Sequence, residues 1–361
     1  MKIPLNRMYV DQEIRDAVME VLDSGRYVKG PRAKEMEVRF AELVGSKHAV
    51  SCSSGSTALM LAFKALDVGP KDEVIVPSHT FIATLNGFWH YGARPRFVDI
   101  DPDTYAVDTE KVKEAVNERT AGIVPVHLYG HPADMGELTD IAEEAEVPLV
   151  GDAAQAHGAK YRGQDIGSMG DMTCYSFFPS KVITVAGEGG MITCDDDELY
   201  ELLKALRNHG RYSGERDISS LAGFNMRMPE ILAAVGSIQL DHMADWVSRR
   251  REIAKVYTQE LEGTGELVLP KEMEWAEHVY YLYVIRTGER DALREHLRKK
   301  GISTGIHYSV PVHRMPYIES PPELPVTERI VREILSLPMH PLLSEEEQKT
   351  VIEGVREFSG G

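Results

Sequence analysis

Residues 175–190 read YSFFPSKVITVAGEGG, and the rest of the chain is organised around this stretch. A short apolar run ends at Pro179 and Ser180, Lys181 follows, and a glycine-rich turn begins at Gly187. A lysine between an apolar strand and a glycine turn can lie partly desolvated, and desolvation disfavours the charged amine. An uncharged amine attacks an aldehyde and forms a Schiff base. The stretch therefore predicts that Lys181 binds pyridoxal phosphate (PLP), although these residues alone also fit an ordinary loop lysine.

The composition is that of a soluble globular protein, with 43% hydrophobic and 27% charged residues. A length of 361 residues favours one large domain and one smaller domain. The formal net charge of −17 argues against a nucleic-acid partner, because phosphate backbones require a basic face. An anionic small substrate remains possible, but it would need local cationic groups.

Neither a membrane segment nor a metal site is expected. No apolar stretch is long enough to span a bilayer, and the first residues have no apolar core of signal-peptide length. Cys52, Cys174 and Cys194 lack metal-ligand spacing and lie in or beside apolar runs. We therefore expect buried free thiols in a cytoplasmic protein.

Residues 51–65, SCSSGSTALMLAFKA, predict an anion site. A serine-rich turn leads directly into a helical pattern, and the first turn of a helix presents unpaired N–H groups and the positive end of its dipole. Ser56 and Thr57 add hydroxyl groups, and Gly55 allows an anion to approach closely. A plain helix N-cap is the alternative.

Strands and helices alternate through the next hundred residues. Strands are expected at 73–77, 95–100, 122–128 and 147–152, and helices near 80–91, 108–117 and 134–146. Two further helices are expected at 11–23 and 31–44. This alternation predicts a parallel sheet with helices on both faces, in which ligands bind at the carboxyl ends of the strands.

Asp152 stands at such a strand end. A buried carboxylate needs a cationic partner, and a protonated pyridine nitrogen would be one. An aspartate that caps a local turn is the alternative. Phe81 could stack on a flat cofactor ring or belong to the core, and Ser176 could give its hydroxyl to a phosphate.

The pattern changes beyond residue 228. Residues 229–263 predict one long helix or two joined helices, followed by a strand at 278–286, a helix at 289–301 and a strand at 302–308. Two helices are expected at 327–337 and 344–358, the second with a capping box of Ser344 and Glu347.

Several motifs, in order, resemble the DegT/DnrJ/EryC1/StrS family of PLP-dependent sugar aminotransferases. They are SSGSTALMLAFKAL, DEVIVPSHTFIATLNG, GDAAQAHGA, YSFFPSKVITVAGEGG, LRNHGR and GFNMRMPEILAAVGSIQL. The resemblance extends from SGRYVKGPR (24–32) to GIHYSVPVHRMPY (305–317). It implies a fold-type I aminotransferase with a mostly parallel seven-stranded sheet in a large domain (1–240) and a small α+β domain (241–361). It also implies a homodimer with shared active sites.

The resemblance assigns roles residue by residue. Lys181 is expected to be the Schiff-base lysine and proton carrier, and Asp152 to pair with the pyridine nitrogen. The other expected cofactor contacts are Gly55, Ser56, Thr57 and Ser176 at the phosphate, Gln155 at the phenolic oxygen, Phe81 on the ring, and Asn225 at the phosphate of the neighbouring subunit. Arg227, His307, Tyr308 and His313 are expected near the substrate, where Arg227 and Arg211 could face a diphosphate or a carboxylate.

The implied reaction moves an amino group from glutamate to a nucleotide-linked keto-sugar. A sugar dehydratase of the same family is an alternative, but those relatives carry histidine in place of the lysine. A non-catalytic regulator on the same fold is the other, and the chain has no recognisable DNA-reading module.

Overall fold

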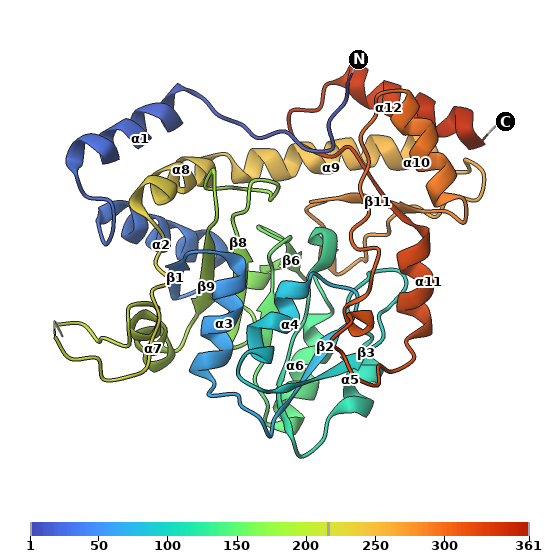
Figure 1. Cartoon of the computed structure of the whole chain (residues 1–361). Coiled ribbons are helices and arrows are strands. Elements are labelled where there is room, and N and C mark those ends of the chain that lie inside the picture. The colour runs from blue at the N-terminus through green and yellow to red at the C-terminus, as the bar shows by residue number, and fades with distance from the viewer. Residues whose placement is uncertain (1, 215–216, 360–361) are drawn as a thin grey trace.

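The computed structural model describes residues 2–214 and 217–359, and it has an α/β architecture (Figure 1). One sheet contains, in this order, β1 (His48–Cys52), β9 (Gly190–Cys194), β8 (Met172–Ser176) and β5 (Val150–Asp152). A second, fully parallel sheet contains β3 (Arg94–Val98), β2 (Glu73–Pro77) and β4 (Thr120–Ile123). Isolated parallel bridges, Ile123–Leu149 and Val126–Asp152, join the two sheets edge to edge.

Strand direction decides where the site can form. β9 runs antiparallel to both of its neighbours, so β1 and β8 point the same way, and β5 is parallel to β8. The carboxyl ends of β1, β8 and β5 therefore meet at one edge. The helices that connect or flank these strands are α1 (Gln12–Ser24), α2 (Pro31–Val44), α3 (Gly55–Ala65), α4 (Ile82–Trp89), α5 (Thr109–Ala115), α6 (Met135–Ala145), α7 (Asp197–Arg207) and α8 (Glu230–Asp241).

Local sequence explains most of these helix boundaries. α2 begins with Pro31, whose fixed φ suits a first helical position, and it ends before Gly45, which is left-handed at φ 69°. α3 begins after Ser54, whose hydroxyl accepts a hydrogen bond from the Thr57 backbone N–H while the Ser54 N–H donates to the Thr57 hydroxyl. The predicted plain N-cap is thus present at the start of α3.

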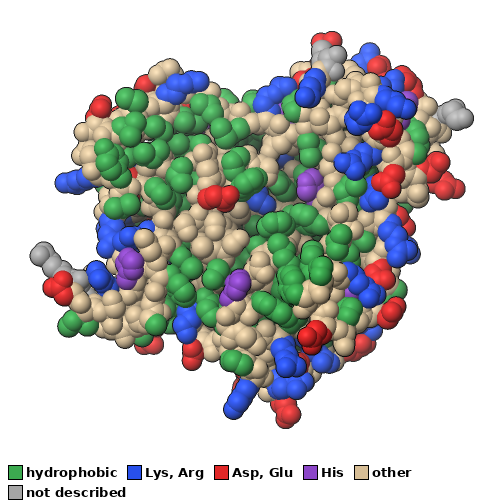
Figure 2. Space-filling view, viewed as in Figure 1, with side chains coloured by type: hydrophobic (Ala, Val, Ile, Leu, Met, Phe, Trp, Pro, Cys, Tyr) green, Lys and Arg blue, Asp and Glu red, His purple; other side chains and the backbone are tan. Residues whose placement is uncertain are grey.

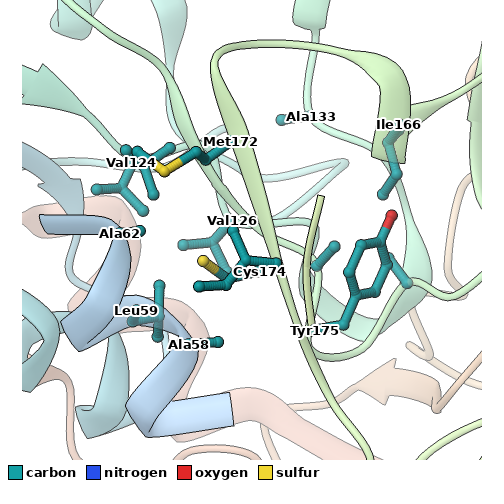
Figure 3. Packing of buried hydrophobic residues seen from close by; sticks show 14 of the residues in the cluster. Ala58, Leu59, Ala62, Val124, Val126, Ala133, Ile166, Met172, Cys174 and Tyr175 are labelled. Carbon is teal, nitrogen blue, oxygen red and sulfur yellow. The ribbon is translucent and has the colours of Figure 1, made fainter. Parts of the chain in front are cut away.

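The main core lies between α3 and the sheet (Figure 3). Ala58, Leu59 and Ala62 on one side of α3 face Val124, Val126, Met172 and Cys174 from the strands. All of them are buried, and so are the three cysteines, which are free thiols. This packing fixes the first turn of α3 against the end of β8.

The C-terminal part has its own core around α9 (Met243–Leu261), which follows α8 directly. Its other elements are α10 (Arg290–Lys299), α11 (Pro325–Glu333), α12 (Glu345–Ser359) and the antiparallel pair β11 (Tyr283–Arg286) and β12 (Ile334–Leu337). Ile3 is buried in this second core, so the N-terminal segment crosses to the C-terminal part (Figure 1). A small antiparallel sheet, β10 (Ala276–Glu277), β6 (Lys160–Tyr161) and β7 (Gln164–Asp165), lies beside the main one.

Two predictions for the C-terminal part are wrong. Residues 327–337 form α11 and then a strand, because Ile334–Leu337 pairs along its whole length with β11, and this tertiary pairing overrides the local helical pattern. Residues 302–308 make only single bridges, at Ile302 and Gly305, instead of a strand. The capping box of Ser344 and Glu347 is confirmed by two hydrogen bonds of 3.0 and 3.1 Å. Within the described residues, no helix is long and apolar enough to cross a membrane.

Candidate active site

Lys181 lies in a turn that leaves the carboxyl end of β8, and its half-buried side chain lines a cavity of about 390 Å³. Its backbone N–H donates to the carbonyl of Phe178 at 2.9 Å, which closes the turn. The carbonyl of the preceding residue, Ser180, accepts a hydrogen bond of 2.9 Å from the Asn6 side chain. The N-terminal segment therefore helps to hold the lysine turn in place.

Asp152 ends β5 and lines the same cavity, although its side chain is almost fully buried. The Thr84 hydroxyl donates to Oδ2 at 2.7 Å, and the Ala154 N–H donates to Oδ1 at 3.1 Å. Burial raises the pKa of Asp152, while these two hydrogen bonds and the charge of Lys181 oppose the rise. The Asp152 carboxylate accepts the Ala154 N–H and so caps a local turn, which is the alternative role given in the sequence analysis. The same carboxylate lines the cavity, where a cationic group of a ligand would be its partner.

The first turn of α3 and the end of β8, where the sequence predicts an anion site, form one side of the cavity. Gly55, Ser56 and Ser176 all line it. The first N–H groups of a helix have no intrahelical acceptor, and the first two residues of α3, Gly55 and Ser56, line the cavity. A Cβ atom on Gly55 would lie only 2.6 Å from Cβ of Ser176, so glycine is needed for this close approach.

The remaining wall combines an amide, aromatic rings and a histidine. Gln155 accepts a hydrogen bond of 2.7 Å from the Tyr129 N–H, and its amide group donates to the Tyr308 hydroxyl at 3.0 Å. Phe81 is 51% exposed, so it is not a core residue, and its ring centroid lies 5.4 Å from that of Tyr308. His307 lines the cavity as well, and burial followed by the charge of Lys181 lowers its pKa to about 4.

Four predicted site residues do not line this cavity: Thr57, His313, Asn225 and Arg227. The Thr57 hydroxyl is used by the cap of α3 and does not line the cavity. His313 is fully buried, and its ring is hydrogen-bonded to Ser78 and to Glu328, so its side chain is turned away from this cavity. Asn225 is exposed and lies outside this cavity.

Arg227 lines a second cavity of about 490 Å³. It shares that cavity with Lys29, Arg207 and Arg211, and its Nη1 donates to the Asn208 side chain at 3.0 Å. Burial and the charges of the three arginines lower the pKa of Lys29. Lys29 carries no local signal in the sequence, because only the fold brings residue 29 beside residue 227. In all, six lysine and arginine residues line this cavity together with Glu37 and Glu201, and the excess of positive charge favours an anionic ligand.

The donor set of the first cavity fits PLP. A primary amine, a buried carboxylate and a helix N-terminus with serine hydroxyls converge from separate elements. These are the groups that an aldehyde, a pyridine nitrogen and a phosphate require. The fold and the site together define an α/β enzyme of the PLP-dependent class.

The comparisons with known proteins agree with this class. The model of the DegT/DnrJ/EryC1/StrS aminotransferase family matches residues 8–356, and the chain belongs to this family. It is therefore an aminotransferase, as the resemblance implied. Solved structures of related sugar aminotransferases include PLP and PMP forms, which confirms the predicted cofactor.

Individual relatives are similar over nearly their whole length. A dTDP-3-amino-3,4,6-trideoxy-alpha-D-glucose transaminase from Streptomyces venezuelae is 43% identical over 95% of this chain and 91% of its own. A pleiotropic regulatory protein from Geobacillus stearothermophilus is 41% identical over 96% of this chain and 95% of its own. The crystal structure of S. venezuelae DesV in complex with a ketimine intermediate superposes with a TM-score of 0.95, at 40% identity, covering 100% of this chain and 99% of that one.

Proposed function

We propose that this aminotransferase moves an amino group from glutamate to a nucleotide-linked keto-sugar and so makes an amino-sugar for polysaccharide, glycoconjugate or natural-product synthesis. The observation that carries the proposal is the convergence of Lys181, Asp152 and the first turn of α3 on one cavity. Relatives named as dTDP- and UDP-sugar aminotransferases, at 35% to 43% identity, support the substrate class.

Each residue around the cavity has a distinct task in this proposal. When bound, PLP supplies an aldehyde that bonds to amines and a ring that withdraws electrons from the attached carbon. Lys181 carries the proton between the donor or acceptor carbon and the cofactor. Asp152 would keep a positive charge on the ring nitrogen, since its buried carboxylate lines the same cavity.

The remaining groups bind and orient. Gln155 is held by Tyr129 and Tyr308, so its amide can reach the ring edge in one orientation. Phe81 would cover one face of the ring, and Gly55, Ser56 and Ser176 would hold the phosphate, since all four line the cavity. His307 stays neutral near pH 7, since burial lowers its pKa, and offers the substrate a hydrogen bond without a charge.

We propose a homodimer in which the cavity that contains Arg227 and Lys29 faces the substrate diphosphate of the partner subunit. Large apolar side chains are exposed on and after α1, including Met19, Leu22 and Tyr27, and apolar side chains gather over this region in Figure 2. An apolar surface of this kind favours burial against a second copy. Asn225, which lies outside the PLP cavity of its own chain, would then reach the phosphate of the neighbouring site.

The domain division and the location are part of the same proposal. The large domain would end with α8 and the small domain begin with α9, within a fold-type I architecture whose two sheets act as one seven-stranded sheet. Three buried free thiols favour a reducing, cytoplasmic location.

The test is a half-reaction with glutamate. The purified chain loaded with PLP should convert its aldehyde absorbance to that of the amine form, and 2-oxoglutarate should appear in equal amount. Lys181→Ala should fold and bind the cofactor without converting it. Addition of nucleotide keto-sugars, followed by mass spectrometry, then identifies the acceptor.

A regulatory role is the second candidate, because one relative is named a pleiotropic regulatory protein. A folded, PLP-loaded chain that converts with no amino donor at all would favour this role over transamination. The dehydratase alternative predicts dehydration products with the keto-sugar instead of an amino-sugar, and the lysine at position 181 disfavours it.

A further inference from the structure

Tyr281 of the C-terminal part lies directly against Lys181. Nζ of Lys181 stands 5.0 Å from the centroid of the Tyr281 ring, on its face. The Tyr281 hydroxyl is hydrogen-bonded to the Ser180 hydroxyl at 3.0 Å. The tyrosine is only 6% exposed and lines the PLP cavity. One side chain therefore touches both the lysine amine and the residue that precedes the lysine.

The backbone of Tyr281 is itself held firmly. Arg250 of α9 is 1% exposed, and its Nη1 donates to the carbonyls of Tyr280, Tyr281 and Met339 at 3.3, 3.1 and 3.1 Å. On the other side, the Leu282 N–H donates to the Tyr129 carbonyl at 3.3 Å. The ring thus occupies a fixed place at the junction of the two cores.

A fixed ring restricts where the lysine amine can go. The lysine side chain is a flexible four-carbon stem, so an unanchored amine would sample many positions in the cavity. The face of an aromatic ring attracts an ammonium group, and this attraction strengthens where water is excluded. The hydroxyl bond to Ser180 at the same time fixes the point from which the stem starts.

We propose that Tyr281 is a positioning residue for Lys181: its ring holds the free amine, and its hydroxyl holds Ser180, so that the amine meets the cofactor aldehyde from one direction. The inference rests on the proposed role of Lys181. In the step concerned, the ammonium held over the ring first gives up a proton to water, the neutral amine nitrogen then bonds to the aldehyde carbon, and the carbonyl oxygen leaves as water. Neither the family resemblance nor the sequence pattern pointed to this tyrosine.

The test measures capture of PLP by the cofactor-free, full-length chain. The rate of bond formation is followed by absorbance, and the bond is then reduced with cyanoborohydride and located by peptide mass spectrometry. Tyr281→Leu should capture PLP about tenfold more slowly, since the cation–ring contact is lost. Tyr281→Phe keeps the ring and should be about two- to threefold slower, since only one hydrogen bond is lost.

Tyr283→Phe is the matched control. Tyr283 lies two residues away in the second core, and its hydroxyl makes a similar bond of 2.9 Å to Thr258; neither residue lines the PLP cavity. This variant should capture PLP at the unaltered rate. Pyridoxamine phosphate, which cannot bond to a lysine, measures the non-covalent site, and its affinity should be the same in all variants.

Two results would overturn the inference about Tyr281 while leaving the role of Lys181 intact. One is capture by Tyr281→Leu at the unaltered rate. The other is a loss of pyridoxamine phosphate affinity as large as the loss of capture rate, which would make Tyr281 a wall of the cavity only. If the unaltered chain itself shows no label on Lys181, the assignment of the lysine fails first. Should Tyr281→Leu not fold, the contrast between Tyr281→Phe and Tyr283→Phe decides.

Discussion

Replacement of Gly55 by alanine should weaken cofactor binding through a steric effect at one point. A Cβ atom at this position would stand 2.6 Å from Cβ, 3.1 Å from Oγ and 3.2 Å from Cα of Ser176. Carbon atoms prefer a separation of about 3.5–4.0 Å, so the overlap with the serine Cβ is about 1 Å. Either the first turn of α3 or the end of β8 must move, and both form the proposed phosphate site.

Overpacking of this kind costs about 1–3 kcal/mol. If the cost falls on the bound state, the dissociation constant for pyridoxamine phosphate should rise about 5- to 150-fold, since each 1.4 kcal/mol is a factor of ten. Titration of the cofactor-free chain by absorbance or fluorescence measures this constant. Gly288→Ala is the control, because a Cβ atom at Gly288 would meet nothing within 4 Å.

A double-mutant cycle separates this contact from other effects of the substitution. Ser176→Gly removes two of the three close atoms, so Gly55→Ala should cost at least about 1 kcal/mol less in that background than in the unaltered chain. Equal costs in the two backgrounds, or no cost in either, would refute the reasoning that the close approach of Gly55 to Ser176 shapes the site.

Three further predictions concern charge and assembly. Asp152→Asn should lower the half-reaction rate at least about 100-fold but weaken cofactor affinity by about tenfold or less, since a neutral amide still accepts hydrogen bonds but cannot stabilise a cation; equal losses would indicate a structural aspartate. Mixed dimers of an Asn225→Ala chain and a Lys181→Ala chain should recover activity through one intact site, and a complete lack of recovery contradicts the role across subunits. Burial lowers the pKa of His157 to about 3, so the folded chain lacks a proton that the unfolded chain binds below about pH 6.5, and stability falls as the pH falls through this window. Between pH 6.5 and 5.0, the free energy of unfolding measured in urea should therefore fall by about 2 kcal/mol less for His157→Gln than for the unaltered chain. An equal fall in the two chains would show that the folded state does not depress the pKa of His157.

Sequence alone predicted the parts of the site that lie on strand ends and helix starts. Lys181, Asp152 and Gly55 each follow a short apolar run; the rule that ligands bind at the carboxyl ends of strands indicated Asp152, and the family resemblance assigned all three to one cofactor site. Local signals also gave the ends of α2 and the cap of α12. These features depend on neighbours within a few residues, so a pattern can report them.

The residues whose surroundings the sequence did not predict share one physical cause. His313 carries a polar group in a loop near the site, but its ring turns inward to Ser78, 235 residues away in sequence. In the sequence, Tyr281 is one of several aromatic residues in a predicted strand. Only the fold, through the hydrogen bond from Arg250 of α9 to the Tyr281 carbonyl, places its ring against Lys181. Thr57 was assigned to the phosphate, yet its hydroxyl already serves the Ser54 cap. Each outcome was decided by a partner that local sequence does not reveal.

Strand register is the feature on which the whole site depends. Asp152 pairs with Cys174 of β8, and Ser176 stands two residues further along the same strand, so both side chains lie on the same face. Ser51 and Cys52 of β1 pair across β9 at the same edge, which brings Gly55 against Ser176. A slip of one residue between β5 and β8 would turn the carboxylate to the opposite face while leaving the anion site intact. Val150, Met172 and Cys174 are buried in these strands. They oppose such a slip, because it would also break the match between the buried faces of β5 and β8. The core packing in Figure 3 is therefore part of the catalytic geometry: it sets which face of β5 the carboxylate of Asp152 occupies.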